Sequence, residues 1–398
     1  MKILVFNCGS SSLKFEMLEL ARDPRERRQI ARGKFEEVGP RAKAVMTDAS
    51  GNKTETSVAL ENQAAAALRA LQWLESTVGE SRPDVVVHRI VHGGEQVTAP
   101  ALVNDAVVRA LDEASRFAPL HNPPALATLR AVSEKLAGVP AVVVPDTAFH
   151  HTLPEHARTY AIPRALAARH GIRRFGFHGI GHAWMMERYA EICATPVEDL
   201  RLVTLQLGAG CSAAAISGGR SVDTSMGLTP LEGLMMATRS GDLDPAIVGY
   251  LAKAEQITPE QVEQILNRDS GLLGVSARSD DLRELESCSG ENESAALALK
   301  IFCYRVRKYI GAYLAVLGGA DAIIFGGGIG ENSDGTRAHI CTGLEQLGIR
   351  LDEVRNREAN GREVSINADG SRIKLYVIPL DEELYMARAA ARLVGIES

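Results

Sequence analysis

Two segments of this 398-residue chain repeat one pattern, an apolar strand, a turn of small residues and a second strand. The first covers residues 3–20 and the second residues 202–227. Short apolar runs bounded by glycine and serine are typical of buried strands. Placing residues 4–10 over 204–210 aligns the two turns, with small shifts allowed. The repeat favours a gene duplication in which each half contributes a turn to one cleft; chance is the alternative, because strand–glycine–strand segments are common.

Strands and helices alternate along the rest of the chain, as in an α/β protein. Helices are predicted where apolar residues recur with helical spacing, over residues 61–79, 293–319 and 381–395. Residues 321–333 are predicted to form a strand, a glycine loop and the start of a helix. The length suggests two domains. No low-complexity linker separates the halves, so we expect the domains to be in close contact across a cleft.

The composition excludes several classes of protein. The formal net charge is −6 and aromatic residues make up 5% of the chain, so no nucleic-acid partner is expected. No apolar run reaches the ~18 residues of a membrane span, and the apolar run at the start is too short for a signal peptide. The six cysteines are scattered without a C-x-x-C pair, which argues against disulfides and zinc and predicts a reduced, cytoplasmic protein.

The first turn carries the side chains of an anion site. Gly9 lets backbone N–H groups converge, and Ser10, Ser11 and Ser12 add hydroxyl donors. Lys14 lies two residues after Ser12, so both side chains are expected on one face of the strand. Donors and a cation on one face favour an anion such as phosphate. The alternative is an exposed hairpin with an isolated lysine, and the P-loop motif is absent.

Two further glycine turns follow strands. Residues 208–210 combine two glycines with little side-chain bulk, and residues 326–330 contain four glycines. A backbone without side chains allows close approach of a phosphate or a flat ligand. The third turn alone is a weak indication of a ligand, because glycines after strands often serve packing only.

Charged residues near the ends of apolar strands indicate a cleft, because burying them in a core would be costly. Arg89 follows one such run and Asp146 ends another, while His178 and Arg239 lie in segments with glycine. A structural ion pair is the alternative for Arg89. Three aspartates could ligate a cation but more often brace turns: Asp223, Asp242 and Asp244. Three anion-friendly turns with two arginines, a lysine and carboxylates together indicate phosphoryl transfer.

Motifs along the chain resemble those of the acetate kinase family. In chain order they are FNCGSSSLKF, HRIVHGGE, PLHNPP, PDTAFH, GFHGIGH, DTSMGLTPLEGLMMATRSGDLDP, GGGIGEN and PLDEELYMAR. They extend from residue 6 to residue 388, so the resemblance covers nearly the whole chain.

The resemblance implies two duplicated ribonuclease-H-like α/β domains around a central cleft, the fold of acetate and sugar kinases, heat-shock chaperones and actin. It implies an N-terminal actin-like ATPase domain over residues 1–150, completed by a C-terminal helix at about 381–398. Residues 151–380 would form a nucleotide-binding and dimerising domain. The resemblance further implies a cytoplasmic homodimer that uses ATP and Mg²⁺ to phosphorylate acetate reversibly, by direct in-line attack of the carboxylate.

Matching motifs imply a role for each residue. The resemblance implies that the catalytic residues are Asp146, His178 and Arg239. Arg89 resembles the arginine that holds the substrate carboxylate, and the pocket for the acetate methyl group is matched by Val91, Leu120, Phe177 and Pro230. The Mg²⁺ positions are matched by Asn7 and Glu382. Phosphate and nucleotide contacts are matched by Ser10, Ser12, Lys14, Gln206, Leu207, Gly208, Ala209, Gly210, Asp281, Leu282, Arg283, Gly328, Ile329, Gly330, Glu331 and Asn332.

The chain departs from the family pattern at several positions near the phosphates. Gln206 and Ala209 stand where the family usually has histidine and asparagine, and Gly181 stands where it has serine. Ala237 replaces a glycine and Leu380 replaces a threonine. Losing a hydrogen bond to a charged phosphate costs ~1.5–3 kcal/mol, which would slow the reaction roughly tenfold to a hundredfold.

Three alternatives to an acetate kinase stay open. The chain could act on propionate or butyrate, although Val91 and Phe177 argue against a large pocket. It could be a weak paralogue or a sensor that binds nucleotide or acetyl phosphate without turnover, which only the altered turn at 206–210 supports. It could form actin-like filaments, but this leaves the cationic residues unexplained.

Overall fold

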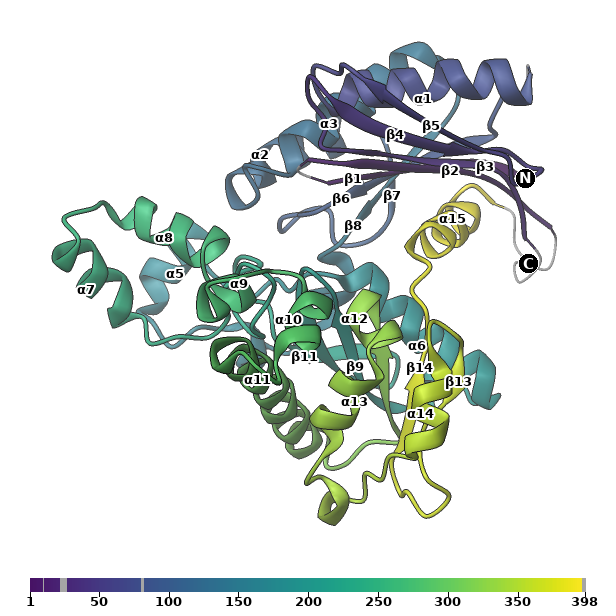
Figure 1. The fold of residues 1–398 in the computed structure, drawn as a ribbon. Helices are drawn as coiled ribbons and strands as arrows, with labels where there is room; N and C mark the ends of the chain where they lie inside the picture. Colours follow the sequence, from purple (N-terminus) through teal and green to yellow (C-terminus); the bar gives the residue numbers. More distant parts are fainter. Residues whose placement is uncertain (10, 22–26, 80–81, 396–398) are drawn as a thin grey trace. The chain divides into compact units, whose positions relative to one another are not determined.

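The computed structural model describes residues 1–9, 11–21, 27–79 and 82–395. The chain divides into two compact units. Unit 1 comprises Met1–Phe149 and Asp381–Ser398, and unit 2 comprises His150–Leu380. Each unit is built around its own sheet (Figure 1). Among the described residues no helix is long and apolar enough to cross a membrane.

Unit 1 contains an eight-stranded sheet in the order β5-β4-β3-β2-β1-β6-β8-β7. Its strands are β1 (Lys2–Cys8), β2 (Leu13–Leu20), β3 (Arg27–Glu36), β4 (Ala42–Thr47), β5 (Lys53–Val58), β6 (Val85–Ile90), β7 (Ala101–Leu102) and β8 (Ala141–Pro145). Its main helices are α1 (Gln63–Val78), α2 (Asp105–Ala114), α3 (Asn122–Lys135) and α15 (Glu382–Leu393). The first five strands are antiparallel, whereas β1, β6 and β8 run parallel to one another.

Alternation of side chains along β1 decides which face of the sheet each residue serves. Leu4, Phe6 and Cys8 belong to the apolar core that includes α1 and α3. The other face of β1 is covered by α15, which contacts β1, β6 and β8 (Figure 1). Asn7 lies on this second face, so its amide meets the first turn of α15.

Unit 2 contains a six-stranded sheet in the order β11-β10-β9-β12-β14-β13. Its strands are β9 (Arg201–Leu207), β10 (Cys211–Ser217), β11 (Arg220–Thr224), β12 (Ala322–Gly326), β13 (Val364–Ser365) and β14 (Lys374–Val377). Its helices are α4 (Glu155–Arg158), α5 (Arg164–His170), α6 (Gly179–Cys193), α7 (Ala246–Ala254), α8 (Pro259–Arg268), α9 (Gly271–Ser276), α10 (Leu282–Cys288), α11 (Glu293–Leu317), α12 (Gly327–Asn332), α13 (Asp334–Cys341) and α14 (Glu353–Ala359). The helices predicted over 61–79, 293–319 and 381–395 are therefore present as α1, α11 and α15.

The two sheets share one topology. In each, three consecutive strands form an antiparallel meander, β1-β2-β3 or β9-β10-β11. Two later strands then add in parallel beside the first strand of the meander. The matching order supports the predicted duplication.

The register of the hairpins refines the alignment of the two repeats. Asn7 is paired with Lys14 across the first hairpin, and Gln206 with Ser212 across the second. Asn7 therefore corresponds to Gln206, a shift of one residue that lies within the small shifts the predicted alignment allowed. The reason is that four residues separate the paired strands in the first turn and three in the second, a difference that strand patterns do not reveal.

The predicted glycine loop after β12 is also wrong, because residues 327–332 form α12 directly. Gly327 adopts a φ of 77°, and a Cβ at this position would lie 2.6 Å from the carbonyl oxygen of Leu207. Its N–H donates to Oε1 of Glu331 over 2.9 Å. Glycine is therefore required for the close approach of α12 to β9 rather than for a loop.

Candidate active site

Unit 1 places the predicted residues of the first turn at the end of β1. Asn7 is in β1, and Lys14 lies opposite it on β2. The N–H of Gly9 donates to the carbonyl oxygen of Ser12 over 2.9 Å, which closes the turn. Lys14 is exposed, so its ammonium group can reach an anion from solvent. Ser10, the remaining predicted phosphate contact of this turn, lies outside the described residues.

Arg89 on β6 joins two other predicted residues of unit 1. Its guanidinium donates to Oδ2 of Asp146 over 2.8 Å and to Oδ1 of Asn7 over 3.2 Å. Asp146 follows β8 and is only 1% exposed. Burial lowers the pKa of Arg89, but the carboxylates of Asp146, Glu382 and Glu383 raise it more, so the net shift is upward. The ion pair that the sequence left as an alternative for Arg89 is present.

The first turn of α15 brings two carboxylates to Asn7. Nδ2 of Asn7 donates to Oε2 of Glu382 over 3.0 Å and to Oε1 of Glu383 over 3.2 Å. Among the described residues no group of three or more histidine, cysteine or acidic side chains could hold a metal ion. Mg²⁺ keeps several waters and needs only one or two carboxylates from the protein. The oxygen donors of Glu382 and Asn7 therefore fit a partial Mg²⁺ ligand set.

In unit 2, the second turn brings two predicted catalytic residues together. Residues 208–210 connect β9 to β10. A Cβ on Gly210 would lie 3.2 Å from Cε1 and 3.3 Å from Nε2 of His178, and 3.7 Å from Nη1 of Arg239. An imidazole and a guanidinium thus border the space above this glycine. Burial lowers the pKa of Arg239, yet an arginine keeps its charge in a protein.

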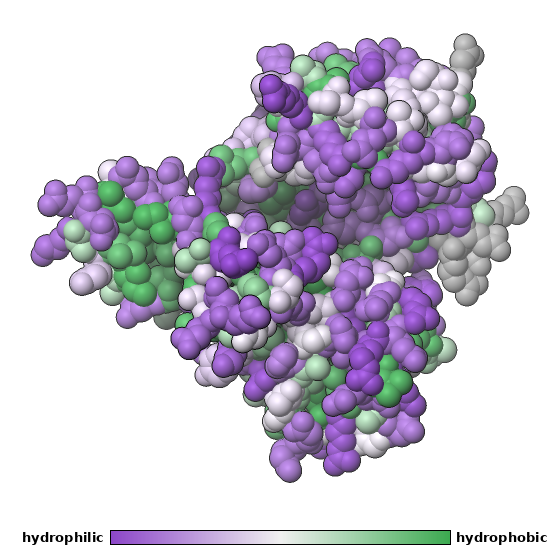
Figure 2. Space-filling model, in the orientation of Figure 1, coloured by the Kyte–Doolittle hydropathy of each residue, from purple (hydrophilic) through white to green (hydrophobic). Residues whose placement is uncertain are grey.

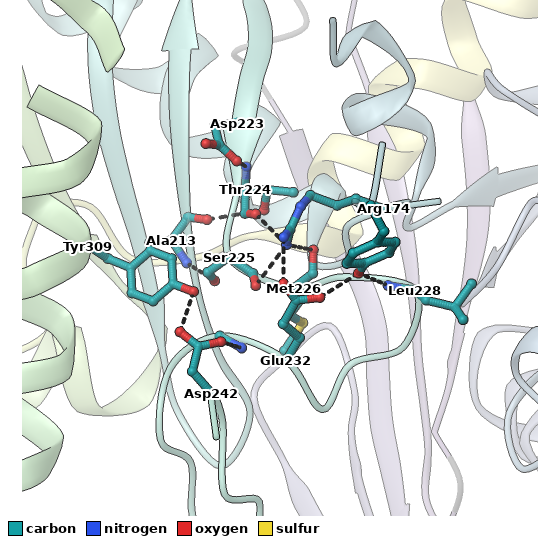
Figure 3. Close-up of polar contacts among 12 residues, drawn as sticks. Arg174, Ala213, Asp223, Thr224, Ser225, Met226, Leu228, Glu232, Asp242 and Tyr309 are labelled. Atoms are coloured by element: carbon teal, nitrogen blue, oxygen red, sulfur yellow. Dashed lines mark hydrogen bonds and ion pairs between the residues drawn. The ribbon is translucent and has the colours of Figure 1, made fainter. Parts of the chain in front are cut away.

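A polar network holds the segment that leads to Arg239 (Figure 3). Arg174 donates to the carbonyl oxygens of residues 224–226 over 3.0–3.2 Å and to Oε1 of Glu232 over 2.5 Å. The hydroxyl of Tyr160 donates to the other carboxylate oxygen of Glu232. Further along, Nη1 of Arg239 donates to the carbonyl oxygen of Pro230 over 3.2 Å. Sequence analysis missed this network, because its partners lie 50–72 residues apart in the chain and Tyr160 and Arg174 are outside the motifs quoted above.

The three aspartates considered as cation ligands brace turns instead. Asp242 accepts hydrogen bonds from the hydroxyl of Tyr309 over 2.7 Å and from the N–H of Gly233 over 2.9 Å (Figure 3). Asp223 accepts from the N–H that follows it, and Asp244 accepts from the first N–H of α7. These bonds fix the backbone of the segment that carries Arg239.

The remaining residues predicted to contact the nucleotide in unit 2 lie in or beside two short helices, α10 and α12. Asp281 caps α10 and forms an ion pair of 2.6 Å with Arg283. In α12, Glu331 accepts two backbone N–H bonds and so ties the helix to its surroundings. The nitrogen of Gly328 lies 3.9 Å from where a Cβ on Gly208 would be, so α12 adjoins the second turn.

Other predicted positions differ in exposure. The predicted nucleotide contacts of unit 2 fall into three groups by exposure. The buried ones are Gln206, Leu207, Leu282 and Gly330, the half-buried ones are Gly208, Gly210, Asp281, Ile329 and Glu331, and the exposed ones are Ala209, Arg283, Gly328 and Asn332. Of the four residues predicted to form the pocket for the acetate methyl group, two belong to each unit. Val91 is buried and Leu120 is 59% exposed in unit 1, while Phe177 is buried and Pro230 half-buried in unit 2.

Comparison with known proteins finds relatives of one family along nearly the whole chain. The acetokinase family model matches residues 2–388. The acetate kinase of Chloroherpeton thalassium is 44% identical, over 99% of this chain and 99% of that protein. The acetate kinase of Solibacter usitatus is 45% identical, over 99% of this chain and 98% of that protein.

Solved structures give the same result. The crystal structure of Porphyromonas gingivalis acetate kinase has a TM-score of 0.92 and 38% identity, covering 99% of this chain and 100% of that chain. That of a propionate kinase from Francisella tularensis has a TM-score of 0.90 and 33% identity, covering 98% of each chain. The predicted fold class and the predicted kinase family are confirmed. This chain belongs to the acetokinase family.

Proposed function

We propose that this chain is an acetate kinase, which transfers the γ-phosphoryl group of ATP to acetate and yields acetyl phosphate and ADP reversibly. The observation that carries the proposal is the meeting of His178 and Arg239 at Gly210. An imidazole and a guanidinium beside a glycine turn can stabilise the charge on a phosphoryl group while it is transferred. Membership of the acetokinase family supports ATP and acetate as the substrates.

Acetate, which accepts the phosphoryl group, needs little activation. A carboxylate is already ionised at neutral pH, so it can attack the γ-phosphorus without a general base. One oxygen–phosphorus bond forms as the bond to the β–γ bridging oxygen breaks, and ADP leaves with that electron pair. The main barrier is the approach of two anions, which positively charged groups must offset.

Arg89 is proposed to hold the acetate carboxylate. Its two Nη atoms donate to Asp146 and Asn7, whereas its buried Nε makes no hydrogen bond with any described residue. Leaving a buried donor without an acceptor is costly, so a carboxylate at this edge of the guanidinium would be favoured. Asp146 would keep the guanidinium oriented for this contact.

Phosphate and metal contacts are proposed on the same unit. Ser12 and Lys14, with Ser10, would contact phosphate oxygens. Glu382 and Asn7 would hold Mg²⁺, which when bound neutralises charge on the phosphates of ATP. In unit 2, residues 208–210, 281–283 and 328–332 would contact the nucleotide.

A propionate kinase is the second candidate, because the Francisella tularensis relative bears that name at 33% identity. Val91 is buried and would limit room beside the acetate methyl group. One methylene group is worth only ~1–3 kcal/mol of discrimination. We therefore expect acetate to be preferred and propionate to be accepted more slowly.

We also propose a homodimer through α7. This helix has apolar residues but none that is buried, and Tyr250 is 73% exposed. Figure 2 shows an apolar surface over this helix. Light scattering after size exclusion should give a dimer for the natural chain and a monomer for Tyr250→Glu. Tyr304→Glu on α11, which is also exposed, should stay a dimer; a monomeric natural chain would contradict the proposal.

A cytoplasmic location is proposed as well. All six cysteines are free thiols. Free thiols persist in a reducing compartment, which is also where ATP is available. Fractionation of the native cells, with detection of the protein by antibody, would test the location.

The test of the reaction is a ³¹P NMR experiment with purified protein, ATP, Mg²⁺ and acetate labelled with ¹⁸O in its carboxylate. We expect acetyl phosphate and ADP in equal amounts, with ¹⁸O in the C–O–P bridge. AMP and pyrophosphate, or ATP turnover that does not depend on acetate, would contradict direct attack. Parallel samples with propionate and butyrate rank the acceptors, and faster turnover of propionate would favour the second candidate.

A further inference from the structure

A chain of buried hydrogen bonds extends from His178 into unit 2. Nδ1 of His178 lies 2.9 Å from Oγ of Ser212. The same hydroxyl lies 2.7 Å from Nε2 of His182, whose Nδ1 lies 2.7 Å from Oγ1 of Thr204. Ser212, His182 and Thr204 are completely buried, on β10, α6 and β9. Water therefore does not compete for the two bonds of His182, whereas the bond between His178 and Ser212 is partly buried.

The number of protons limits how this chain can be arranged. Burial lowers the pKa of His182 well below its usual value, and the nearby His150 and His178 lower it further, so its ring is neutral with one N–H. A serine hydroxyl also has one proton to donate. If Thr204 donates to His182, then His182 donates to Ser212 and Ser212 donates to Nδ1 of His178. The proton of a neutral His178 is then on Nε2.

The other ring edge of His178 borders the space above the second turn. A Cβ on Gly210 would lie 3.3 Å from Nε2 of His178 and 3.7 Å from Nη1 of Arg239. Arg239 is a charged group that only donates, so a group held between the two residues must accept hydrogen bonds, and an anion such as a phosphoryl group is favoured. An anion between His178 and Arg239 is stabilised when Nε2 of His178 carries a hydrogen to donate, and is repelled when Nε2 carries a lone pair.

The backbone of His178 also indicates a held side chain. Its φ of 58° and ψ of 24° are left-handed, a conformation that residues other than glycine rarely adopt. Such conformations cost on the order of 1–3 kcal/mol and persist where the surrounding structure imposes them. Here the hydrogen bond to Ser212 and the start of α6 at Gly179 fix the ring beside Gly210.

We propose that Ser212 is a positioning residue: with His182 and Thr204 it holds His178 so that the Nε2–H faces the transferred phosphoryl group. The proposal rests on the proposed function for the identity of that group. Ser212 itself contacts His178 rather than the substrate, so it acts on catalysis only through the imidazole.

The structure offers a matched control. Oγ of Ser221 lies 2.8 Å from Nδ1 of His150, and Ser221 is as completely buried as Ser212. His150 has no part in the proposed reaction. Ser212→Ala and Ser221→Ala therefore remove the same kind of bond at the same burial. His150 also lies 3.0 Å from the carbonyl oxygen of Phe177 and packs against His182, so the difference between the variants is that only Ser212→Ala removes the bond to His178 itself.

The experiment compares these variants by kinetics and by ¹⁵N NMR of histidine-labelled protein, with His178 signals identified from His178→Gln. We expect Ser212→Ala to lower kcat about tenfold to a hundredfold, the usual loss when a residue that orients a group in direct contact with the reacting centre is removed. KM for acetate should stay unchanged within about twofold. The Nε2–H tautomer of His178 should diminish in Ser212→Ala and remain in Ser221→Ala. Thr204→Val, which interrupts the chain beyond His182, should lower kcat in the same direction but less.

Two results would overturn the proposal. One is a kcat of Ser212→Ala no lower than that of Ser221→Ala, and the other is an unchanged His178 tautomer in a folded Ser212→Ala protein. An inactive natural chain would count against the proposed function instead. In that case the tautomer comparison, made with inorganic phosphate as the anion, still decides whether Ser212 positions His178.

Discussion

The side chain of Gln206 fills the space that a side chain at residue 181 would need. A Cβ on Gly181 would lie 2.0 Å from Oε1 and 2.9 Å from Cδ of Gln206. Both positions are among the departures from the family motifs that the sequence analysis noted. The two departures therefore meet in one contact, beside the second turn.

A double-mutant cycle tests this relationship. Gly181→Ala should displace the buried Gln206 carboxamide and destabilise the protein by about 1–3 kcal/mol, as overpacking usually does. In a Gln206→Ala background the same change should cost much less, because the clash is gone. Urea unfolding of the four proteins gives the coupling energy, expected above about 0.5 kcal/mol. Additive effects would show that the two positions are independent.

Gly210 should be intolerant of a side chain for a catalytic reason. Gly210→Ala places a methyl group 3.2–3.3 Å from the ring of His178, in the space proposed for the phosphoryl group. We expect kcat to fall at least about tenfold, since small displacements of reacting groups are costly. Gly311→Ala in α11 meets nothing within 4 Å and is the control, expected to keep activity and gain up to about 1 kcal/mol of stability. Normal turnover by Gly210→Ala would contradict the placement of the site.

The pair of Arg89 and Asp146 allows stability and activity to be separated. Arg89→Ala leaves the Asp146 carboxylate, 1% exposed, without its cation, which should cost about 3–5 kcal/mol. Adding Asp146→Asn removes the buried charge and should restore much of the stability, measured by urea unfolding. Acetyl phosphate formation should remain lost in the double variant. A double variant less stable than Arg89→Ala would argue against the ion pair as the cause.

Glu16 on β2 should make the stability of the protein pH-dependent. Burial raises the pKa of this carboxyl from 4.5 to about 7. Between these values the unfolded chain loses a proton that the folded protein keeps, so stability falls as the pH rises from about 4.5 to about 7. Glu16→Gln should therefore be more stable than the natural chain at pH ~8, by at most about 3 kcal/mol, with the difference shrinking toward pH ~5.

The control for this change is Glu19→Gln on the same strand. Glu19 is paired with Arg28 in a solvent-exposed ion pair, and this hydrogen bond lowers its pKa. Removing its charge should not stabilise the protein at any pH. A Glu16→Gln variant with the same pH profile of unfolding as the natural chain would refute the role of Glu16.

Local patterns in the sequence predicted the elements that have strong periodicity. The apolar spacing of α11 is sufficient, because this helix buries one continuous face. The alternation along β2 predicts a strand, yet residues on both of its faces are buried, among them Glu16 and Met17. The second strand pair was recognised as a repeat of the first, and the shared topology of the sheets supports this. The register differs by one residue, because the lengths of the turns depend on hydrogen bonds that the pattern does not contain.

Residue chemistry singled out Arg89, Asp146, His178 and Arg239 as charged or polar groups of a cleft, and the family motifs then gave each of them a role. Neither source showed what holds these side chains. The contacts of Arg174 with Glu232, and of Gly181 with Gln206, join segments 58 and 25 residues apart, which helical and strand periods cannot relate. The glycines of 326–330 suggested a loop because glycine is common in loops, whereas here they allow close packing of α12.

Two further departures from the family pattern meet through the backbone. The N–H of Ala237 donates to the carbonyl oxygen of Ala209 over 3.1 Å. This bond does not depend on either side chain, so it can form in a chain that has asparagine and glycine there. The loss of the asparagine amide at 209 is thus a change in what the turn can donate to phosphate, not in how the turn is held.

The most direct test of the central claim is the acetate-dependent formation of acyl phosphate, trapped as the hydroxamate. The natural chain and Arg239→Ala would be incubated with ATP, Mg²⁺ and acetate, and nucleotide binding measured in parallel. The account predicts acetyl hydroxamate from the natural chain that requires all three substances and is lost in Arg239→Ala. No product from the natural chain with acetate, propionate or butyrate, while ATP still binds, would contradict it and favour a nucleotide sensor.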